Sequence, residues 1–135
     1  MKKVILVIED LPEEQSRAKE AAIVAGYRPV LADNLKDANR LWESLAGKID
    51  GILTDLHFPQ HGPTGDAVPS GIAVVLRAAA EKIPVVICTS EGHGADYFKS
   101  AMKSLEKITG KVIPVERKNY PVALNRLEEI MEKEV

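Results

Sequence analysis

The sequence predicts an α/β domain built on a five-stranded parallel sheet. Five short apolar runs alternate along the chain with five segments whose apolar residues recur at helical spacing. Three of these runs consist almost entirely of Val, Ile and Leu, which is typical of strands buried on both faces of a parallel sheet. Strands that alternate with helices in this way favour a parallel sheet with helices on both faces.

The expected strands also indicate their order in the sheet. We place them at residues 3–8, 29–32, 50–55, 84–89 and 111–116. Pro29 begins the second strand and Pro114 lies inside the fifth. Proline removes a backbone donor and is tolerated mainly at sheet edges, so the second and fifth strands are expected at the edges. The order 2-1-3-4-5 satisfies this condition.

Five amphipathic helices are expected between and after the strands. We place them at residues 12–25, 35–46, 71–82, 95–109 and 120–133. The apolar stripes at helical spacing include Ala18, Ala21, Ala22 and Ala25 in the first helix, Leu35, Ala38, Leu41, Trp42 and Leu45 in the second, Ile72, Val75, Leu76 and Ala79 in the third, Phe98, Ala101, Met102, Leu105 and Ile108 in the fourth, and Leu124, Leu127 and Met131 in the fifth. Such stripes predict that each helix packs one face on the sheet.

Residues at the helix ends support these boundaries. Pro12 suits a first helical turn. The expected N-caps are Asn34, Ser70 and Asn119, and the expected glycine stops are Gly26, Gly47 and Gly110.

Composition sets limits on the kind of protein. The 135 residues are 45% hydrophobic, which fits a single domain over 1–135 with one core and no second domain. The net charge of -2 provides no strong field for nucleic acid or anionic lipid. Aromatic residues make up 4% of the chain, which argues against a platform for stacking bases. We therefore expect neither nucleic acid nor a membrane among the partners.

The cellular compartment can also be predicted. A single cysteine, Cys88, excludes an internal disulfide and fits a reducing compartment. It lies within an apolar run and is interpreted as core filling rather than a redox group. We find no signal peptide and no apolar stretch near the ~20 residues that a membrane span needs. A cytoplasmic protein is expected.

Polar side chains follow three of the predicted strands where each strand ends. Glu9 and Asp10 follow the first strand, Asp55 ends the third, and Thr89 ends the fourth. The predicted order brings the carboxyl ends of the first and third strands together. Three carboxylates in one place repel each other unless a cation or a proton intervenes, and hard divalent cations prefer such oxygen clusters. The sequence therefore predicts a magnesium-dependent, phosphate-type site.

The connection at residues 57–69 is unusually long. It is rich in Gly, Pro and His, has no periodicity, and is expected to be a loop over this edge of the sheet. Our hypothesis is that it partly covers the site or forms a partner surface. The spacing of His57, His61 and His93 matches no zinc signature.

Three motifs resemble the receiver domain of two-component response regulators. They are Val-Ile-Leu-Val-Ile-Glu-Asp at 4–10, Ile-Leu-Thr-Asp-Leu-His-Phe-Pro at 52–59, and Ile-Pro-Val-Val-Ile-Cys-Thr-Ser at 83–90. They occur in the family's order within one five-unit α/β pattern that covers most of the chain. The resemblance implies a flavodoxin-like three-layer sandwich, and from the length of the chain we expect no effector domain.

The resemblance also implies roles for individual residues. Asp55 would be the phosphoacceptor. Glu9, Asp10, Asp55 and the backbone carbonyl of His57 would hold Mg²⁺. Thr89 would hydrogen-bond the phosphoryl group, and Lys118 is the candidate lysine that would pair with the phosphoryl oxygens. A lysine solvated at the surface remains the alternative for Lys118.

The chain departs from the family pattern at several places. Glu9 stands where the family often has Asp, and the loop from Pro59 to Gly71 carries an insertion. The family usually has Lys-Pro at the end of strand five, whereas Asn119 follows Lys118 here. Strand five also lacks the aromatic residue that is frequent in the family.

The expected function is a stand-alone receiver that switches a partner-binding surface on phosphorylation. The donor would be a histidine kinase, a phosphotransfer protein or a small acyl phosphate, and the downstream protein is unknown. Such a domain is not an enzyme beyond catalysing its own phosphorylation and dephosphorylation. The alternative is a pseudo-receiver, which is a binding module of the same fold that works without phosphorylation.

Small-molecule domains of similar topology form a third class. Asp55-Leu56-His57 resembles the Asp-x-His of cobalamin-binding domains, but Gln60 stands where that motif needs glycine. A flavin site would need a loop rich in glycine and hydroxyl groups after strand one. The sequence there is Leu11-Pro12-Glu13-Glu14, whose acids would repel a phosphate.

Overall fold

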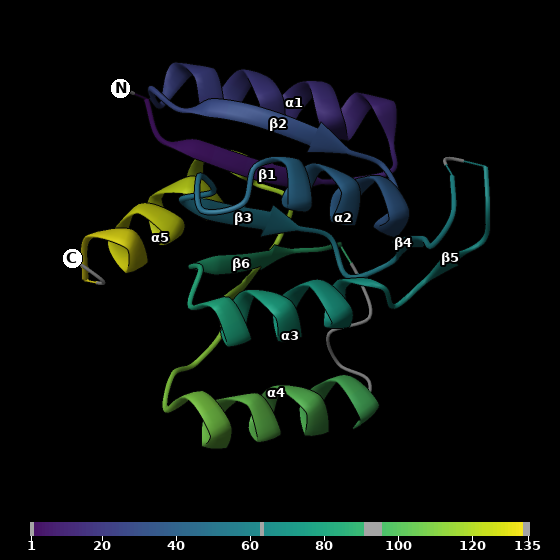
Figure 1. Cartoon of the computed structure of the whole chain (residues 1–135), viewed down its shortest axis with the longest axis vertical. Helices are drawn as coiled ribbons and strands as arrows, with labels where there is room; N and C mark the ends of the chain where they lie inside the picture. Colours follow the sequence, from purple (N-terminus) through teal and green to yellow (C-terminus); the bar gives the residue numbers. More distant parts are fainter. Residues whose placement is uncertain (1, 63, 91–95, 134–135) are drawn as a thin grey trace.

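The computed structural model describes residues 2–62, 64–90 and 96–133, and it has three layers (Figure 1). The central parallel sheet has the order β2-β1-β3-β6-β7. Its strands are β1 (Val4–Ile8), β2 (Arg28–Ala32), β3 (Gly51–Thr54), β6 (Val85–Cys88) and β7 (Val115–Glu116). Because β6 and β7 are the fourth and fifth strands of this sheet, the predicted order 2-1-3-4-5 is confirmed.

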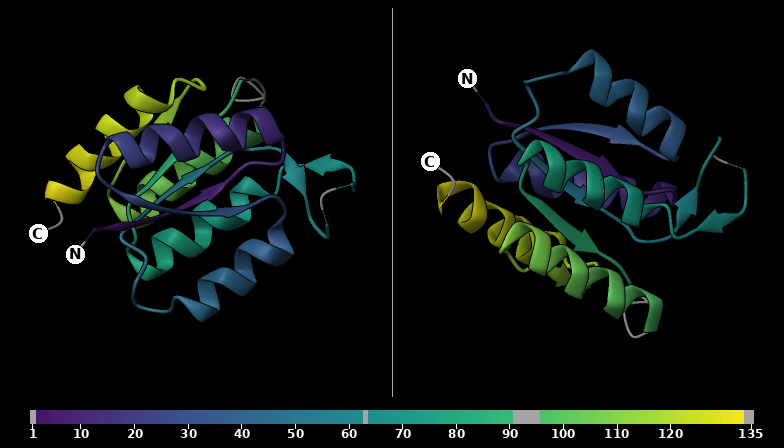
Figure 2. Two further views of the ribbon diagram at one scale, coloured as in Figure 1. Left: turned by 90° about the horizontal axis from the view of Figure 1, so that it is seen from above. Right: turned by 60° about the horizontal axis from the view of Figure 1, so that its bottom comes forward.

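Helices cover both faces of the sheet (Figure 2). They are α1 (Pro12–Val24), α2 (Leu35–Ser44), α3 (Gly71–Glu81), α4 (Asp96–Thr109) and α5 (Tyr120–Lys133). Each lies within one or two residues of its predicted bounds. None of the helices within the described ranges is long and apolar enough to cross a membrane.

Strand alternation divides the apolar residues into two cores. Leu6, Ile52 and Ile87 pack with α2, α3 and α4 on one face, where Trp42 is buried as expected. The neighbouring strand residues point to the opposite face and pack with α1 and α5; they include Ile5, Val7, Leu53, Val86 and Cys88. A residue that extends this second series beyond the end of a strand therefore points toward α1 and α5.

Most predicted helix ends are confirmed, with one correction. The Asn34 side chain accepts a hydrogen bond from the Asp37 N–H at 2.9 Å, and Asn119 accepts one from Val122 at 3.4 Å. Ser70 stands at the N-cap position, but its hydroxyl donates to the Phe58 carbonyl at 3.0 Å and does not cap α3. The serine instead ties the start of α3 to the preceding connection.

The last strand is shorter than predicted. β7 comprises only Val115–Glu116, whereas a strand over 111–116 was expected. Pro114 therefore precedes the strand, and its carbonyl accepts a hydrogen bond from Ile87 at 2.9 Å. Ahead of it, the Thr109 hydroxyl accepts from the Lys111 N–H at 3.2 Å and extends the turn that closes α4. The first residues of the predicted strand at 111–116 therefore belong to this turn and not to β7.

The 57–69 connection also differs from the expected structureless loop. Its short strands β4 (Phe58–Pro59) and β5 (Ala67–Val68) pair antiparallel beside the carboxyl edge of the main sheet (Figure 2). Phe58 is fully buried, and the Gln60 carbonyl accepts a hydrogen bond from the Lys36 N–H at 2.9 Å. The insertion is thus anchored to the first turn of α2.

Gly71 lets α3 begin directly against the end of β3. A Cβ at this position would lie 2.8 Å from the Leu56 Cα and 2.9 Å from the Leu56 carbonyl oxygen. The Gly71 N–H donates to that carbonyl at 2.9 Å. Only glycine permits this backbone approach next to Asp55 without a shift of the chain.

We predict that Gly71→Ala lowers the free energy of unfolding by about 2 kcal/mol, because the new methyl group overlaps backbone atoms that cannot move aside. Urea denaturation would measure the change. Gly65→Ala is the matched control, since its Cβ would meet the nearest atom at an ordinary 3.5 Å. Equal stability of the two variants would contradict this account of Gly71.

Candidate functional site

Glu9 and Asp55 lie side by side just beyond the carboxyl ends of β1 and β3. The register pairs Ile8 with Thr54, so the next residue of each strand is an acid. The Asp55 N–H donates to the Ile8 carbonyl at 2.9 Å, which continues the ladder to the site. Both acids extend the residue series that faces α1 and α5, and both are buried, with 2% and 7% of their surfaces exposed.

Three carboxylates converge at this edge. One carboxylate oxygen from each of Glu9, Asp10 and Asp55 lies within 4.8 Å of the other two. The convergence predicted from the strand ends is therefore confirmed. Oxygen-only ligands of this kind are those that Mg²⁺ prefers, and their mutual repulsion favours a bound cation. The residues present fit such an ion.

Lys118 also reaches the cluster. Its Nζ lies 2.9 Å from Glu9 Oε1 and 3.0 Å from Asp55 Oδ2. The side chain comes from the connection between β7 and α5 and is only 12% exposed. The alternative of a solvated surface lysine is therefore wrong, although proline does not follow Lys118 in the sequence.

The pKa values reflect how crowded with charge this pocket is. Burial, followed by the charge of Asp55, raises the pKa of Glu9 to about 8 against the opposing hydrogen bond from Lys118. Burial also raises the pKa of Asp10. Burial acts to lower the pKa of Lys118, but its contacts with Glu9 and Asp55 outweigh this and raise it. The ammonium of Lys118 therefore stays charged, whereas the raised pKa of Glu9 favours its protonated form at neutral pH.

The backbone fixes the carboxylate of Asp55. Oδ1 accepts a hydrogen bond from the Leu56 N–H at 2.7 Å, while Oδ2 contacts Lys118. The carbonyl of Leu56 is in turn held by the first residue of α3. One oxygen is thus bound to a rigid amide and the other to a side-chain cation.

A network on α1 positions the segment that carries Lys118. The Tyr120 hydroxyl donates to Glu14 Oε2 at 2.7 Å, and Arg17 pairs with Glu14 Oε1 at 2.8 Å. Arg17 also donates to the Lys118 carbonyl at 3.4 Å and lies over the Tyr120 ring. Sequence reasoning missed these residues. The only signal was the spacing of Glu14 and Arg17 on one helix face, which does not reveal a partner more than a hundred residues away.

The remaining predicted site residues have a location but no tested role. Thr89 directly follows β6, is 2% exposed, and donates its N–H to the Glu116 carbonyl at 3.0 Å. Since β6 lies beside β3, Thr89 belongs to the same edge of the sheet. Its contact with a phosphoryl group, and the His57 carbonyl as a metal ligand, stay predictions. His93 lies outside the described residues.

Cys88 is a buried core residue, as expected. Its surface is 3% exposed, and its Sγ donates to the Arg117 carbonyl at 3.2 Å. Burial, followed by the charge of Asp55, raises the pKa of the thiol to about 12. A thiol that stays protonated is a poor nucleophile, which agrees with a packing role.

In its fold, this structure is similar to the receiver domains of response regulators. No protein-family model matches the sequence, and no curated protein matches it significantly. Solved structures do match. A CheY-like response regulator receiver domain protein from Methanospirillum hungatei JF-1 has 14% identity and a TM-score of 0.73 over 98% of this chain and 96% of that chain.

Two further structures agree with this comparison. A response regulator receiver domain protein from Clostridium thermocellum has 16% identity and a TM-score of 0.71 over 98% of this chain and 96% of that chain. The chemotaxis protein CheY4 from Vibrio cholerae has 16% identity and a TM-score of 0.68 over 96% of this chain and 98% of that chain. The chain has the flavodoxin-like fold of response regulator receiver domains.

We predict that Lys118→Met lowers the free energy of unfolding by about 2 kcal/mol in EDTA, because it leaves buried acids without their cation. Added Mg²⁺ should recover most of this loss by binding the folded state. Urea denaturation with and without Mg²⁺ measures both effects. Lys19→Met, at an exposed lysine of α1, is the control. A variant as stable as wild type in EDTA would contradict the expected cost of leaving these buried acids without a cation.

Proposed function

We propose that this chain is a phosphorylatable receiver in which Asp55 accepts a phosphoryl group with the help of Mg²⁺. One observation carries the proposal: the carboxylates of Glu9, Asp10 and Asp55 converge at the carboxyl edge of a receiver-type sheet, and an ammonium group reaches two of them. Phosphoryl transfer depends mainly on positioning and charge neutralisation, and this edge offers both.

In the proposed reaction a carboxylate oxygen of Asp55 attacks the phosphorus of the donor. The bond from phosphorus to the donor nitrogen or oxygen breaks, and the leaving group departs with its electron pair. The product is an acyl phosphate on Asp55. The donor would be the phosphohistidine of a kinase or phosphotransfer protein, or a small acyl phosphate.

Each surrounding residue has a part in this reaction. The Leu56 N–H fixes the orientation of the Asp55 carboxylate. Glu9, Asp10, Asp55 and the His57 carbonyl would hold Mg²⁺, which supplies positive charge to the phosphoryl oxygens when bound. Lys118 would transfer its contact from Asp55 Oδ2 to those oxygens, and Thr89 would donate its hydroxyl to them.

The new phosphoryl group would act as a switch. It adds negative charge and strong acceptors beside Lys118 and Thr89, and both residues are attached to the ends of the last two strands. Movement of these residues would bias the surface that a downstream protein reads. The identity of that protein and the stand-alone form without an effector domain stay predictions.

A pseudo-receiver is the second candidate, and one observation favours it. Lys118 already bridges Glu9 and Asp55 and neutralises part of their charge without a metal ion. A site closed in this way would serve a binding module that works without phosphorylation. The two candidates differ in whether Asp55 reacts.

We predict that acetyl phosphate or phosphoramidate with Mg²⁺ adds the mass of a single phosphoryl group to the wild-type protein. Asp55→Asn should lose this gain, because the amide is not a nucleophile that can replace the carboxylate, and EDTA should suppress it in wild type. Intact-mass spectrometry is the measurement. A folded wild-type protein that remains unlabelled by both donors would overturn the proposal and favour the pseudo-receiver.

A further inference from the structure

The segment that joins β1 to α1 carries two of the three clustered carboxylates, and its backbone sets where they point. The Glu9 N–H donates to the Ala32 carbonyl at 3.0 Å and so continues the pairing of β1 with β2. Only Asp10 lies between Glu9 and Leu11, which already stands at the N-cap position of α1. The direction of Asp10 therefore depends on how this short turn is held.

The usual means of holding such a turn is missing from α1. Leu11 has no side-chain oxygen, so α1 begins without the hydrogen bond that Ser, Thr, Asn or Asp provides from this position. The Leu11 N–H instead donates to Glu9 Oε1 at 3.3 Å. The same oxygen accepts a shorter hydrogen bond from Lys118 at 2.9 Å. A second anchor is needed if the turn is to keep one geometry.

Gln15 provides this anchor. Its side chain is half-buried beside the first turn of α1, and its Nε2 donates to the Glu9 carbonyl at 2.6 Å. Its own N–H donates to the Leu11 carbonyl at 2.9 Å, so the helix holds its backbone. Both polar backbone groups of Glu9 are thus bound, one to the sheet and one to α1. Because the peptide bond is planar, a fixed Glu9 carbonyl also fixes where the backbone of Asp10 begins.

Asp10 depends on the backbone more than the other two acids do. Lys118 contacts the carboxylates of Glu9 and Asp55, and the Leu56 N–H also binds Asp55. Among the residues that the structure describes, no side chain donates to the Asp10 carboxylate, which is only half-buried. Its oxygen nevertheless lies within 4.8 Å of those of the other two acids. The path of the backbone brings it there.

We infer that Gln15 is a positioning residue of the metal site: by holding the Glu9 carbonyl, it orients Asp10 and so tunes the affinity of the cluster for a divalent cation. The inference rests on the metal-assisted function proposed above. Gln15 acts through Asp10 and not on the reacting atoms. Loss of a group that orients metal ligands lowers metal affinity by about 10- to 100-fold.

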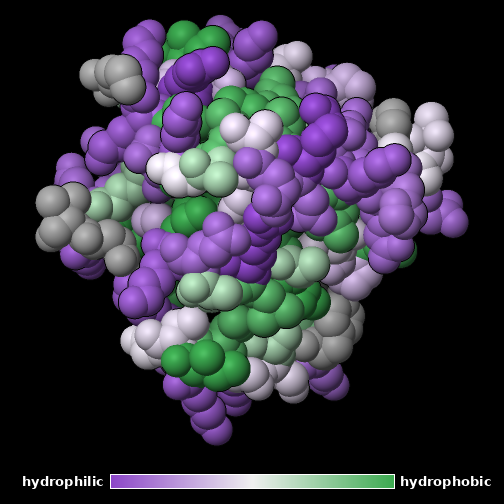
Figure 3. Space-filling view, viewed as in Figure 1, coloured by the Kyte–Doolittle hydropathy of each residue, from purple (hydrophilic) through white to green (hydrophobic). Residues whose placement is uncertain are grey.

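The cluster differs from the other acids of the molecule. Within the described ranges, Glu9, Asp10 and Asp55 form the group of three whose oxygens lie close enough to share one ion. Figure 3 shows that hydrophilic side chains cover much of one face, while apolar surface gathers over α3 and toward the C-terminal end of α4. Hard divalent cations need several oxygen ligands, so isolated surface acids give only a weak background.

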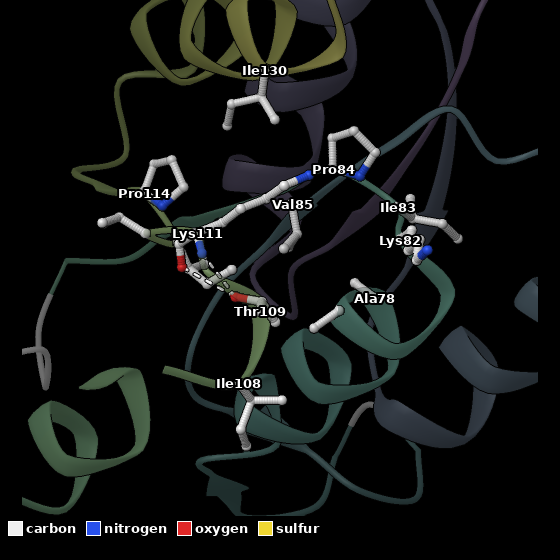
Figure 4. A pocket seen from close by; sticks show the side chains of 13 residues that line it. Ala78, Lys82, Ile83, Pro84, Val85, Ile108, Thr109, Lys111, Pro114 and Ile130 are labelled. Carbon is white, nitrogen blue, oxygen red and sulfur yellow. Dashed lines mark hydrogen bonds between the residues drawn. The ribbon is translucent and has the colours of Figure 1, made fainter. Parts of the chain in front are cut away.

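A concave surface at the other end of the strands does not compete for the ion. It lies where the C-terminal ends of α3 and α4 meet the start of β6, and its volume is about 540 Å³ (Figure 4). Its described lining residues are mainly aliphatic, and the charged ones among them are Lys82 and Lys111. None of these described residues is a carboxylate. Metal binding to the folded protein should therefore report on the acidic cluster.

Binding of Mn²⁺, which takes the same oxygen ligands as Mg²⁺, tests the inference. Electron paramagnetic resonance of the free ion measures the affinity. We expect Gln15→Met to raise the Mn²⁺ dissociation constant about tenfold, because methionine has a similar length and no donor for the Glu9 carbonyl. Ser16→Met, at an exposed neighbour on α1, is the matched control and should bind like wild type. Equal far-UV circular dichroism in EDTA establishes that the variants are folded.

An Asp10→Asn background separates positioning from a general structural role. If Gln15 acts through Asp10, adding Gln15→Met to this background should change the remaining Mn²⁺ affinity by less than about twofold. Labelling of Asp55 by acetyl phosphate gives a second readout. Gln15→Met should raise the Mg²⁺ concentration for half-maximal labelling far more than it lowers the rate at saturating Mg²⁺.

Two results would overturn the inference: an Mn²⁺ affinity that Gln15→Met leaves unchanged, and an equally large loss when the same substitution is made in Asp10→Asn. Failure of the proposed function would look different. If wild type binds Mn²⁺ and Gln15→Met binds it weakly, but neither is labelled, the inference stands and phosphoryl acceptance fails. A wild type that binds Mn²⁺ no more tightly than Asp10→Asn would overturn both.

Discussion

The buried bridge from Lys118 to Glu9 and Asp55 is the interaction on which the site depends. Two carboxylates at adjacent strand ends, almost fully removed from water, would otherwise repel each other strongly. One ammonium at 2.9 Å and 3.0 Å from them reduces this repulsion and links the connection after β7 to β1 and β3. Removing charges from water is costly, so such a bridge holds geometry more than it adds stability. Charged groups that keep a fixed geometry at a cost in stability are typical of functional sites.

The rest of the fold supplies the rigid frame that this bridge requires. The backbone hydrogen bonding between β1 and β3 continues one residue beyond the strands. It places Glu9 and Asp55 next to each other at the same level along the two strands. Gly71 allows α3 to begin against the backbone of Leu56, whose N–H binds the Asp55 carboxylate. On the other face, Glu14 and Tyr120 hold α5 against α1, so the lysine approaches from a fixed direction. The site is therefore supported from both layers of helices.

Sequence reasoning succeeded where a local signal fixes a global position. Pro29 marks an edge strand because a missing donor cannot be tolerated in the sheet centre, and the acids at strand ends must meet once the order is known.

Sequence reasoning failed where the outcome depends on competition between segments. The residues after Gly110 have strand-like character, but the hydrogen bonds of Thr109 extend the turn instead. Pairing of Phe58 with Val68 gives the insertion its strands, and no periodicity in two-residue strands could have indicated it. Lys118 stayed open because side-chain reach depends on the path of a loop.

The charge balance of the cluster gives a physical reason why both a lysine and a metal ion fit the same site. If all three carboxylates were ionised, they and the ammonium would leave two negative charges, which a single Mg²⁺ would balance. Without the ion, the raised pKa of Glu9 shows that the pocket resists holding this excess charge. A phosphoryl group on Asp55 would return negative charge to the site, so the lysine and the metal ion would then both be needed. The cluster with its bridge would therefore favour binding of one divalent cation, which is the ion that the proposed phosphoryl transfer would require.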